Sequence, residues 1–377
     1  MKFRIERQVL AEAVSRTARI IPLRPAAPVL GGIKIEADTQ GTITFSGFDY
    51  EVSARENVTA EVEEPGVVLV QGKLLAEITR ALNNAPVDVA LDGTTLQITC
   101  HNAHFSLQTF PAEEYPTLPE PPAIIGRIDA EEFGKAVAQV ATAASTDETV
   151  PLLTGIRMEI EGEKITLMST DRYRLALREL TWNPEDPSIS AVALVKSKTL
   201  VDVAKTLGGQ EGTIEMGLST GSGLELIGFS SGGRQTTSQL LSGDYPPVRK
   251  LFPESSPIHA SVMVHNLLDS VKRVALVTQG SSPIRLSFTQ GGVTLNAGNG
   301  DDAQASESLH AYLNGEDISV AFNPKYLMDG LSSLSHEAVR LSFTHPTKPV
   351  EFTSQDSLEA DDYTEFRYLL VPIRFAD

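Results

Sequence analysis

Apolar and polar residues alternate along three stretches of the chain, and in each stretch the alternation crosses a short turn and then resumes. These stretches are 30–51, 153–174 and 282–302. Alternation with a period of two, interrupted by glycine or charged residues, is typical of a β-hairpin. Ile33, Ile156 and Ile284 occupy equivalent places and are 123 and 128 residues apart. The pattern therefore predicts three similar hairpins.

Each predicted hairpin is preceded by a segment with helical spacing, in which apolar residues recur three or four positions apart. The apolar positions are Leu10, Ala13, Val14 and Ala18, then Phe133, Ala136, Val137 and Ala141, then Leu267, Val271 and Ala275. After each hairpin, a short apolar run leads into a second helical segment. These junctions read "VLVQGKLLAEI" (68–78), "ALVKSKTLVDV" (193–203) and "VAFNPKYLMDG" (320–330).

A lysine marks each of these strand-to-helix junctions. Lys198 lies 125 residues after Lys73, and Lys325 lies 127 residues after Lys198. A period of this length indicates repeated domains, because solenoid repeats span only 20 to 50 residues. Proline-rich segments at 110–122 and 241–253 suit linkers. We therefore expect an α+β protein of three repeated domains, each with two helices packed on an antiparallel sheet, at 1–122, 123–254 and 255–377.

The lysine helices are expected to have one apolar and one basic face. A residue advances about 100° around a helix axis, so positions two and nine after the lysine lie on the opposite side. Those positions hold Leu75 and Leu82, Leu200 and Leu207, and Leu327 and Leu334. Arg80 and Lys205 lie seven residues after Lys73 and Lys198, on the same side as those lysines. Each helix should thus bury its leucines and direct its basic side chains outward.

The first helices carry further basic residues, namely Arg7, Arg16 and Arg19, then Lys135, then Lys272 and Arg273. On any single helix, a solvated charged face would explain them equally well. Because the pattern recurs on equivalent helices, we expect one basic surface on the assembled molecule. Such a surface can hold a polyanion even though the whole protein is acidic.

Composition is ordinary for a globular protein, with 41% hydrophobic and 21% charged residues. The 31 basic and 49 acidic residues give a formal charge of −18, which alone argues against binding to nucleic acid. The lone cysteine, Cys100, indicates a reducing compartment. No segment resembles a signal peptide or an apolar membrane span, so we expect a soluble, cytoplasmic protein.

Several motifs together resemble a known family. They are the threefold unit, "MKFRIER" at the start, "STDRYRLAL" (169–177), "GDYPPVRKLFP" (243–253) and "YLLVPIRF" (368–375). The combination resembles the bacterial DNA polymerase III beta subunit, the replicative sliding clamp, and the resemblance covers the whole chain.

The resemblance implies a head-to-tail homodimer that forms a ring of six domains around double-stranded DNA, with the helices lining the hole. It implies partners that dock on the outside, namely the DNA polymerase III alpha subunit, the clamp loader and other proteins with a clamp-binding motif. Phosphate contacts without base reading suit sliding. No cofactor, metal or membrane is implied.

The resemblance also implies particular residues. DNA contacts fall on Arg24, Lys73 and Lys198, and the helix faces add Arg80, Lys205 and Lys325. The dimer interface falls on Phe105 and Leu107, opposite Ala275 and Leu276. A peptide groove between the second and third domains would be lined by Leu153, Thr170, Arg172, Tyr173, Arg174, Leu175, Pro246, Lys250, Leu251, Asn323, Tyr326, Thr347, Val371, Pro372 and Ile373. Arg172 stands where the family commonly has glycine, and Tyr173 where it has histidine.

Enzymatic motifs are weak. None of the seven histidines has the spacing of an HExxH zinc site. We therefore expect a processivity factor with no catalytic constellation of its own. Two alternatives stay open: a three-domain scaffold that binds proteins but not DNA, and a soluble enzyme.

Overall fold

The computed structural model describes residues 1–208, 212–221, 223–278, 282–298 and 303–374. By internal contacts the chain divides into two compact units. Unit 1 comprises Met1–Glu131, Asn183–Pro187 and Asp202–Leu240, and unit 2 comprises Glu132–Trp182, Ser188–Val201 and Leu241–Asp377. Two helices, α3 (Ala130–Ala141) and α4 (Ser197–Leu207), carry residues of both units.

Unit 1 contains two whole helices and a long sheet. The helices are α1 (Arg7–Thr17) and α2 (Gly72–Ala81). The strands are β1 (Lys2–Ile5), β2 (Gly32–Ala37), β3 (Thr42–Phe48), β4 (Val52–Thr59), β5 (Glu61–Glu64), β6 (Gly66–Gln71), β7 (Val87–Asp92), β8 (Thr95–Cys100), β9 (Ala103–Phe110), β10 (Ile124–Asp129), β14 (Asn183–Pro184), β16 (Thr213–Ser219), β17 (Leu226–Ser231) and β18 (Arg234–Gln239).

Unit 2 also combines two whole helices with antiparallel strands. Its whole helices are α5 (Val264–Val274) and α6 (Pro324–Ser332). Its strands are β11 (Gly155–Glu161), β12 (Lys164–Thr170), β13 (Arg174–Thr181), β15 (Ser190–Lys196), β19 (Ile258–Met263), β20 (Ile284–Thr289), β21 (Gly292–Ala297), β22 (Ala305–Leu309), β23 (Tyr312–Asn314), β24 (Ile318–Phe322), β25 (Ala338–Phe343), β26 (Val350–Gln355) and β27 (Asp362–Leu370).

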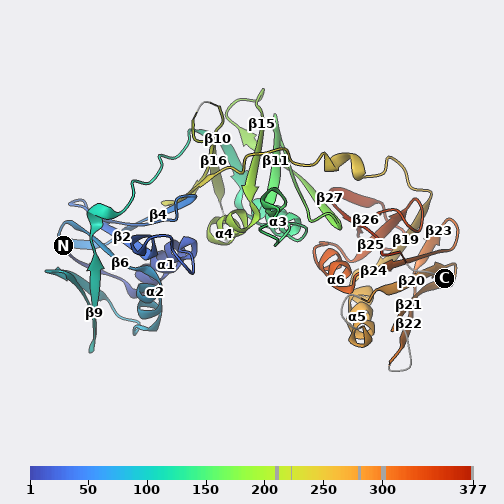
Figure 1. The fold of residues 1–377 in the computed structure, drawn as a ribbon, viewed down its shortest axis with the longest axis horizontal. Coiled ribbons are helices and arrows are strands. Elements are labelled where there is room, and N and C mark those ends of the chain that lie inside the picture. The colour runs from blue at the N-terminus through green and yellow to red at the C-terminus, as the bar shows by residue number, and fades with distance from the viewer. Residues whose placement is uncertain (209–211, 222, 279–281, 299–302, 375–377) are drawn as a thin grey trace. The chain divides into compact units, whose positions relative to one another are not determined.

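The described strands form three antiparallel sheets. The sheet of unit 1 has the order β14-β10-β16-β17-β18-β4-β3-β2-β6-β9-β8-β7-β1-β5. Unit 2 has one sheet ordered β15-β11-β12-β13-β27-β26-β25-β19-β23 and another ordered β22-β21-β20-β24. Within unit 1, helices α1 and α2 pack on each other, and within unit 2 helices α5 and α6 do the same (Figure 1). Antiparallel strands with helices on one face form the α+β layer that the sequence predicts.

The three predicted hairpins are confirmed as β2–β3, β11–β12 and β20–β21. In each repeat, the first hairpin strand also pairs with the strand that enters the lysine helix. Ile33 faces Val70, Ile156 faces Val195, and Ile284 faces Phe322. The three isoleucines are fully buried. The recurring spacing in the sequence thus corresponds to one recurring pattern of strand pairing.

The cores follow from the amphipathic patterns. In unit 1, Leu10 and Val14 of α1 and Leu75 of α2 are buried with the inward side chains of the sheet. In unit 2, Leu267 of α5 and Leu327 of α6 are likewise buried with the inward side chains of the strands. Burying apolar side chains at about 25 cal/mol per Å² is the main force that attaches these helices to their sheets.

Candidate functional site

The lysine helices bury their leucines as the sequence predicts. Leu75, Leu200 and Leu327 each have at most 1% of their surface exposed. Lys198 and Lys325 are exposed at the first turn of α4 and α6. Asn323 caps α6, because its side-chain oxygen accepts hydrogen bonds from two backbone amides of the first turn. The cap fixes the start of α6, from which Lys325 extends.

Lys73 differs from the other two lysines because it is only half exposed. Its Nζ donates a hydrogen bond to the carbonyl oxygen of Pro22 at 2.9 Å. Pro22 begins the connection between Ile21 and Pro28, in which Arg24 is exposed. Lys73 therefore anchors the loop that carries Arg24, so the two predicted DNA contacts belong to one local structure.

The remaining predicted DNA contacts are solvent-facing. Arg80 and Lys205 are exposed, as are Arg24, Lys198 and Lys325. Across the described ranges, none of these five side chains takes part in an ion pair. Lys205 and Arg80 belong to unit 1, and Lys198 and Lys325 to unit 2. Unpaired, hydrated cations of this kind are available for phosphate groups.

Some basic side chains of the first helices are paired with carboxylates. Arg16 donates to both carboxylate oxygens of Glu56, at 2.9 and 3.0 Å, and also pairs with Glu12. On α5, Arg273 pairs with Glu307, and this hydrogen bond lowers the pKa of the Glu307 carboxyl. Lys135 remains exposed on α3. Neutralisation on α1 and α5 leaves more of the free positive charge on the lysine helices.

The predicted groove begins at the tight turn between β12 and β13. The Oδ1 atom of Asp171 accepts the backbone amides of Tyr173 and Arg174, each at 3.0 Å. The Thr170 hydroxyl donates to the carbonyl oxygen of Arg174 at 2.7 Å. Arg172 has φ = 81°, in the left-handed region that favours glycine. This backbone conformation gives the physical reason for glycine at that place in the resembling family.

Next to this turn, Arg174 holds a pair of stacked tyrosines in place. Its guanidinium is mostly buried, pairs with Asp171 at 2.9 Å and Asp329 at 2.6 Å, and lies 4.3 Å from the ring centroid of Tyr326. The rings of Tyr173 and Tyr326 stack with centroids 6.2 Å apart. Burial raises the pKa of the Tyr326 hydroxyl. Two tyrosines thus form a wall braced by a buried cation.

The floor beside this wall is apolar. Leu153, Leu175 and Leu369 belong to one buried cluster, and Leu175 faces Leu369 across the β13–β27 pair. The other buried members of the cluster are Met168, Leu177, Leu194, Tyr245, Val248 and Phe252. Apart from Leu153 and Leu175, none of these buried residues was predicted as a groove residue. The period of two along β13, from Leu175 to Leu177, is the sequence signal that could have found one of them.

Residues 371–373, which follow β27, lie beside the turn between β12 and β13. The amide of Val371 donates to the carbonyl oxygen of Tyr173 at 2.9 Å, and the amide of Ile373 donates to that of Ala321 at 2.7 Å. These bonds bring the predicted residues Val371, Pro372 and Ile373 beside the turn and the end of β24. Val371 is exposed, whereas Pro372 is buried. A partly exposed apolar strip therefore lies next to the tyrosine wall.

The other predicted groove residues lie on exposed connections. Tyr173 and Leu251 are each 56% exposed, and Pro246 and Lys250 are also exposed. Thr347 lies between β25 and β26, where its hydroxyl is 3.0 Å from Nδ1 of His345. Open apolar and aromatic side chains of this kind suit a peptide that supplies its own hydrophobic residues.

The equivalent position in unit 1 is closed by different residues. The turn between β3 and β4 repeats the geometry, because Asp49 Oδ1 accepts the amides of Glu51 and Val52. Phe48 then corresponds to Thr170 and packs in a cluster with Tyr115. The pair that corresponds to Leu175 and Leu369 is Ser53 opposite Thr237. This position in unit 1 therefore has a polar strand pair and a packed phenylalanine, where unit 2 has an apolar pair and a threonine.

The predicted interface residues lie on one strand, β9, and on the short 3-10 turn that follows helix α5. Strand β9 pairs with β8 along its length but with β6 only through Thr109 and Phe110. Leu107 is 5% exposed and belongs to the core of unit 1, with Phe105 packed against that core. In unit 2, Leu276 is 84% exposed and Ala275 is partly buried. Of these four side chains, Leu276 is the one most available for contact.

Three absences among the described residues concern metal sites, a catalytic motif and membrane-spanning helices. Among the described residues, no group of three or more His, Cys, Asp or Glu side chains is placed to hold a metal ion. Gly228–Gly232 reads Gly-Phe-Ser-Ser-Gly, but it runs along β17 into a hairpin turn rather than into a helix. It therefore lacks the strand-to-helix elbow that exposes a nucleophilic serine. Within the described part of the chain, no helix is long and apolar enough to cross a bilayer.

Sequence models of the DNA polymerase III beta subunit match the chain in three consecutive pieces. The N-terminal domain matches residues 1–119, the central domain matches 127–247 and the C-terminal domain matches 249–367.

Full-length relatives agree. The beta sliding clamp of Streptomyces coelicolor is 50% identical over 376 residues and 100% of both chains. The beta sliding clamp of Micrococcus luteus is 51% identical over 309 residues, which are 82% of this chain and 98% of that one. The crystal structure of the DNA polymerase sliding clamp from Bacillus subtilis matches with a TM-score of 0.90 at 26% identity, covering 100% of both chains.

The repeated antiparallel fold and its lysine helices are those of a three-domain DNA clamp. The chain belongs to the DNA polymerase III beta subunit family, and its function is that of a sliding clamp in DNA replication.

Proposed function

We propose that this chain acts as a closed ring around duplex DNA and tethers the replicative polymerase to it, without catalysing a reaction itself. The observation that carries this proposal is the recurrence of one lysine at the start of α2, α4 and α6, each above a buried leucine. A closed ring stays on DNA through its topology, so the cations need to bind phosphates only weakly. Weak contacts that read no base allow the ring to slide.

The ring is proposed to be a head-to-tail homodimer of three-domain subunits, with domains at 1–122, 123–254 and 255–377. Residues 103–108 of β9 lack a second partner strand within the described residues, and β22 pairs only with β21 there. A free strand edge readily pairs with another chain. Joining β9 of one subunit to β22 of the next, with Leu276 beside them, would close a cyclic assembly. A mass near twice 40.6 kDa in solution would support this arrangement.

The apolar cluster with Leu153, Leu175 and Leu369 is the proposed docking site for partner peptides. The exposed side chains beside this cluster, Tyr173, Leu251 and Val371, supply the area that a peptide would bury, and the tyrosine wall and Arg174 fix the direction of the peptide. The proposed partners are the DNA polymerase III alpha subunit, the clamp loader and other proteins with a clamp-binding motif. Because replication takes place on the bacterial chromosome, the proposed place of action is the cytoplasm.

A groove variant tests this site. Val371→Asp combined with Tyr173→Ala should reduce binding of the alpha subunit at least tenfold, because it removes two exposed contact surfaces and places a charge in an apolar strip. Val192→Ser removes a similarly exposed apolar side chain from β15 and serves as the matched control. Unchanged affinity of the double variant, with both proteins dimeric, would show that partners bind elsewhere. A chain that binds these proteins but is never retained on DNA would favour the scaffold alternative.

A further inference from the structure

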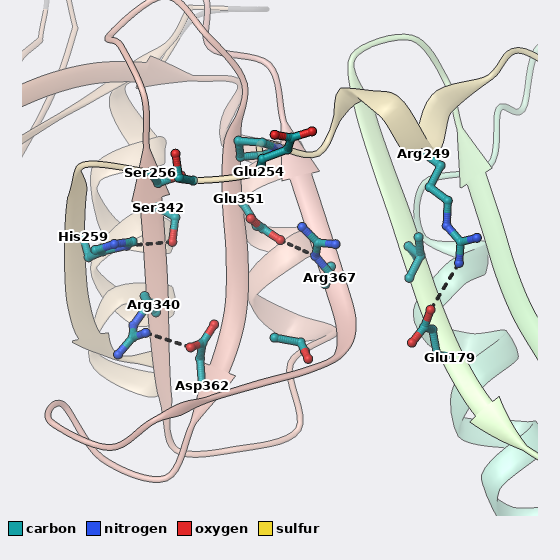
Figure 2. Close-up of a pocket in the computed structure, with 14 residues that line it drawn as sticks. Glu179, Arg249, Glu254, Ser256, His259, Arg340, Ser342, Glu351, Asp362 and Arg367 are labelled. Atoms are coloured by element: carbon teal, nitrogen blue, oxygen red, sulfur yellow. Dashed lines mark hydrogen bonds and ion pairs between the residues drawn. The ribbon is translucent and has the colours of Figure 1, made fainter. Parts of the chain in front are cut away.

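A second, charged pocket lies in unit 2 beside the apolar cluster. It has a volume of about 590 Å³ and is lined from β13, β19, β25, β26 and β27 and from the segment Pro253–Ser256. Figure 2 shows Arg249 and Glu179 on one side of it and Arg367, Glu351 and Glu254 on the other. Farther along, Arg340 pairs with Asp362 at 2.7 Å, and His259 lies 3.1 Å from the Ser342 hydroxyl.

The pocket lining carries three arginines, Arg249, Arg340 and Arg367, and four carboxylates, Glu179, Glu254, Glu351 and Asp362. Two of the arginines have guanidinium nitrogens without a partner in the described part of the chain. The Nε atom of Arg340 is buried and has no hydrogen-bond partner among the described residues. The guanidinium of Arg367 binds Glu351 through Nε and lies 4.2 Å from the ring centroid of Phe252. Its two terminal nitrogens have no acceptor in the described structure. Two free parallel N–H groups on a stacked guanidinium are arranged to bind a carboxylate in bidentate fashion.

The pocket continues the apolar floor along the same strands. Leu175 faces Leu369, and two residues farther along Leu177 faces Arg367. Side chains two residues apart on a strand point to the same face and lie about 7 Å apart. Leu177 belongs both to the apolar cluster and to the pocket lining, and Phe252 of that cluster lies under Arg367. A partner segment that binds over this apolar cluster therefore reaches the guanidinium of Arg367 within two or three residues of its own chain.

We propose that this pocket binds an acidic side chain of the same partner segment whose apolar residues occupy the groove, through the free guanidinium nitrogens of Arg367. The inference rests on the proposed function of the groove and adds a charge preference to it. The formal charge of the chain is −18, which by itself repels acidic segments. A preference for acid therefore has to come from a local site.

The test uses three synthetic peptides that share the clamp-binding segment of the alpha subunit. The three residues before the segment and the three after it are all aspartate in the first peptide, all serine in the second and all lysine in the third. Fluorescence anisotropy should show the aspartate peptide binding about fivefold to tenfold more tightly than the serine peptide, and the lysine peptide more weakly. Arg367→Gln should abolish this preference while leaving the affinity for the serine peptide within about twofold. Arg127→Gln is the matched control, because Arg127 is also a partly exposed strand arginine with carboxylate partners, but in unit 1.

Equal binding of the three peptides to the unaltered protein overturns this inference but leaves the groove intact. If the Arg127→Gln variant also loses the preference for the aspartate peptide, that preference comes from the overall electrostatic field of the protein, and the inference is overturned. If no peptide binds, the groove itself is wrongly placed. Since Arg367→Gln leaves the Glu351 carboxylate largely buried without its partner, Arg367→Gln with Glu351→Gln provides a second variant, which removes one charge of each sign and leaves the net charge of the pocket unchanged.

Discussion

The Nη1 atom of Arg174 lies 2.6 Å from Oδ2 of Asp329, and this ion pair joins the start of β13 to helix α6. The same guanidinium is held by Asp171 and lies over the ring of Tyr326. Asp329 does not belong to the predicted groove lining, yet it fixes the cation that braces the tyrosine wall. We therefore expect the proposed peptide site to depend on a residue that need not touch the peptide.

Asp329→Asn should weaken partner-peptide binding. It removes a charged hydrogen-bond partner of Arg174, and Asp171 alone then holds the guanidinium. We expect a loss of about 1 kcal/mol, near fivefold in Kd, by isothermal titration calorimetry. Asp269→Asn, which breaks an exposed pair with Lys272 on α5, should leave Kd unchanged. Identical affinities for both variants would mean that Asp329 only stabilises the fold.

Arg172→Gly should raise thermal stability. Arg172 is held at φ = 81°, where an L-residue costs about 1–2 kcal/mol and glycine costs nothing. Glycine also makes the unfolded chain more flexible, so the net gain should be about 0.5–1 kcal/mol, or roughly 1–3 °C in Tm. Lys348→Gly, at an exposed bend outside the left-handed region, should lower Tm slightly. A fall in Tm for Arg172→Gly would show that the arginine side chain contributes more than its backbone costs.

Lys73 and Arg24 should act together on DNA retention. Lys73→Met removes both a charge and the hydrogen bond to Pro22 that anchors the loop of Arg24. In a double-mutant cycle with Arg24→Ala, we expect a coupling energy of about 0.5–1.5 kcal/mol in the salt-dependent loss of the clamp from nicked circles. In the control cycle, the effects of Arg80→Ala and Arg24→Ala on DNA retention should add, with no coupling energy. Additivity in both cycles would mean that the loop is positioned without Lys73.

Stability should fall as the pH decreases from about 7 toward 5, in part because of His259. Burial first, and then the charge of Arg340, lower the pKa of His259 below its ordinary value of 6.5, while Asp362 and Glu351 oppose that shift. The unfolded chain therefore takes up a proton at a higher pH than the folded chain does, and stability is lost as the pH falls through this range. His259→Gln should flatten the dependence of Tm on pH. Parallel curves for both proteins would show that His259 titrates normally.

Short-range regularities made most of the fold predictable. Strands show alternation every two residues, and helices show apolar residues three or four positions apart. Both patterns can be read from a single sequence around the repeated isoleucines and lysines. The structure confirms the corresponding hairpins and helices. Long-range side-chain pairing was not predictable in this way. Lys73 meets Pro22 across 51 residues, and Arg174 meets Asp329 across 155.

The same distinction explains what was missed at the candidate sites. Arg16 has the spacing of an outward-facing helix residue, but Glu56, 40 residues away on β4, neutralises it. A helical wheel gives the direction of a side chain but not the charge that a neighbouring strand places in front of it. The positions of Phe252 and Arg367 beside the apolar cluster likewise depend on tertiary packing.

Retention on circular DNA is the most direct measurement of a sliding ring. The protein would be loaded on a nicked plasmid, separated from free protein by gel filtration at physiological salt, and the plasmid then cut once. The dimer should co-elute with the nicked circle and leave after linearisation, because a ring held by topology slides off a free end. Equal retention on circular and linear DNA, or none on either, would contradict encirclement of the duplex.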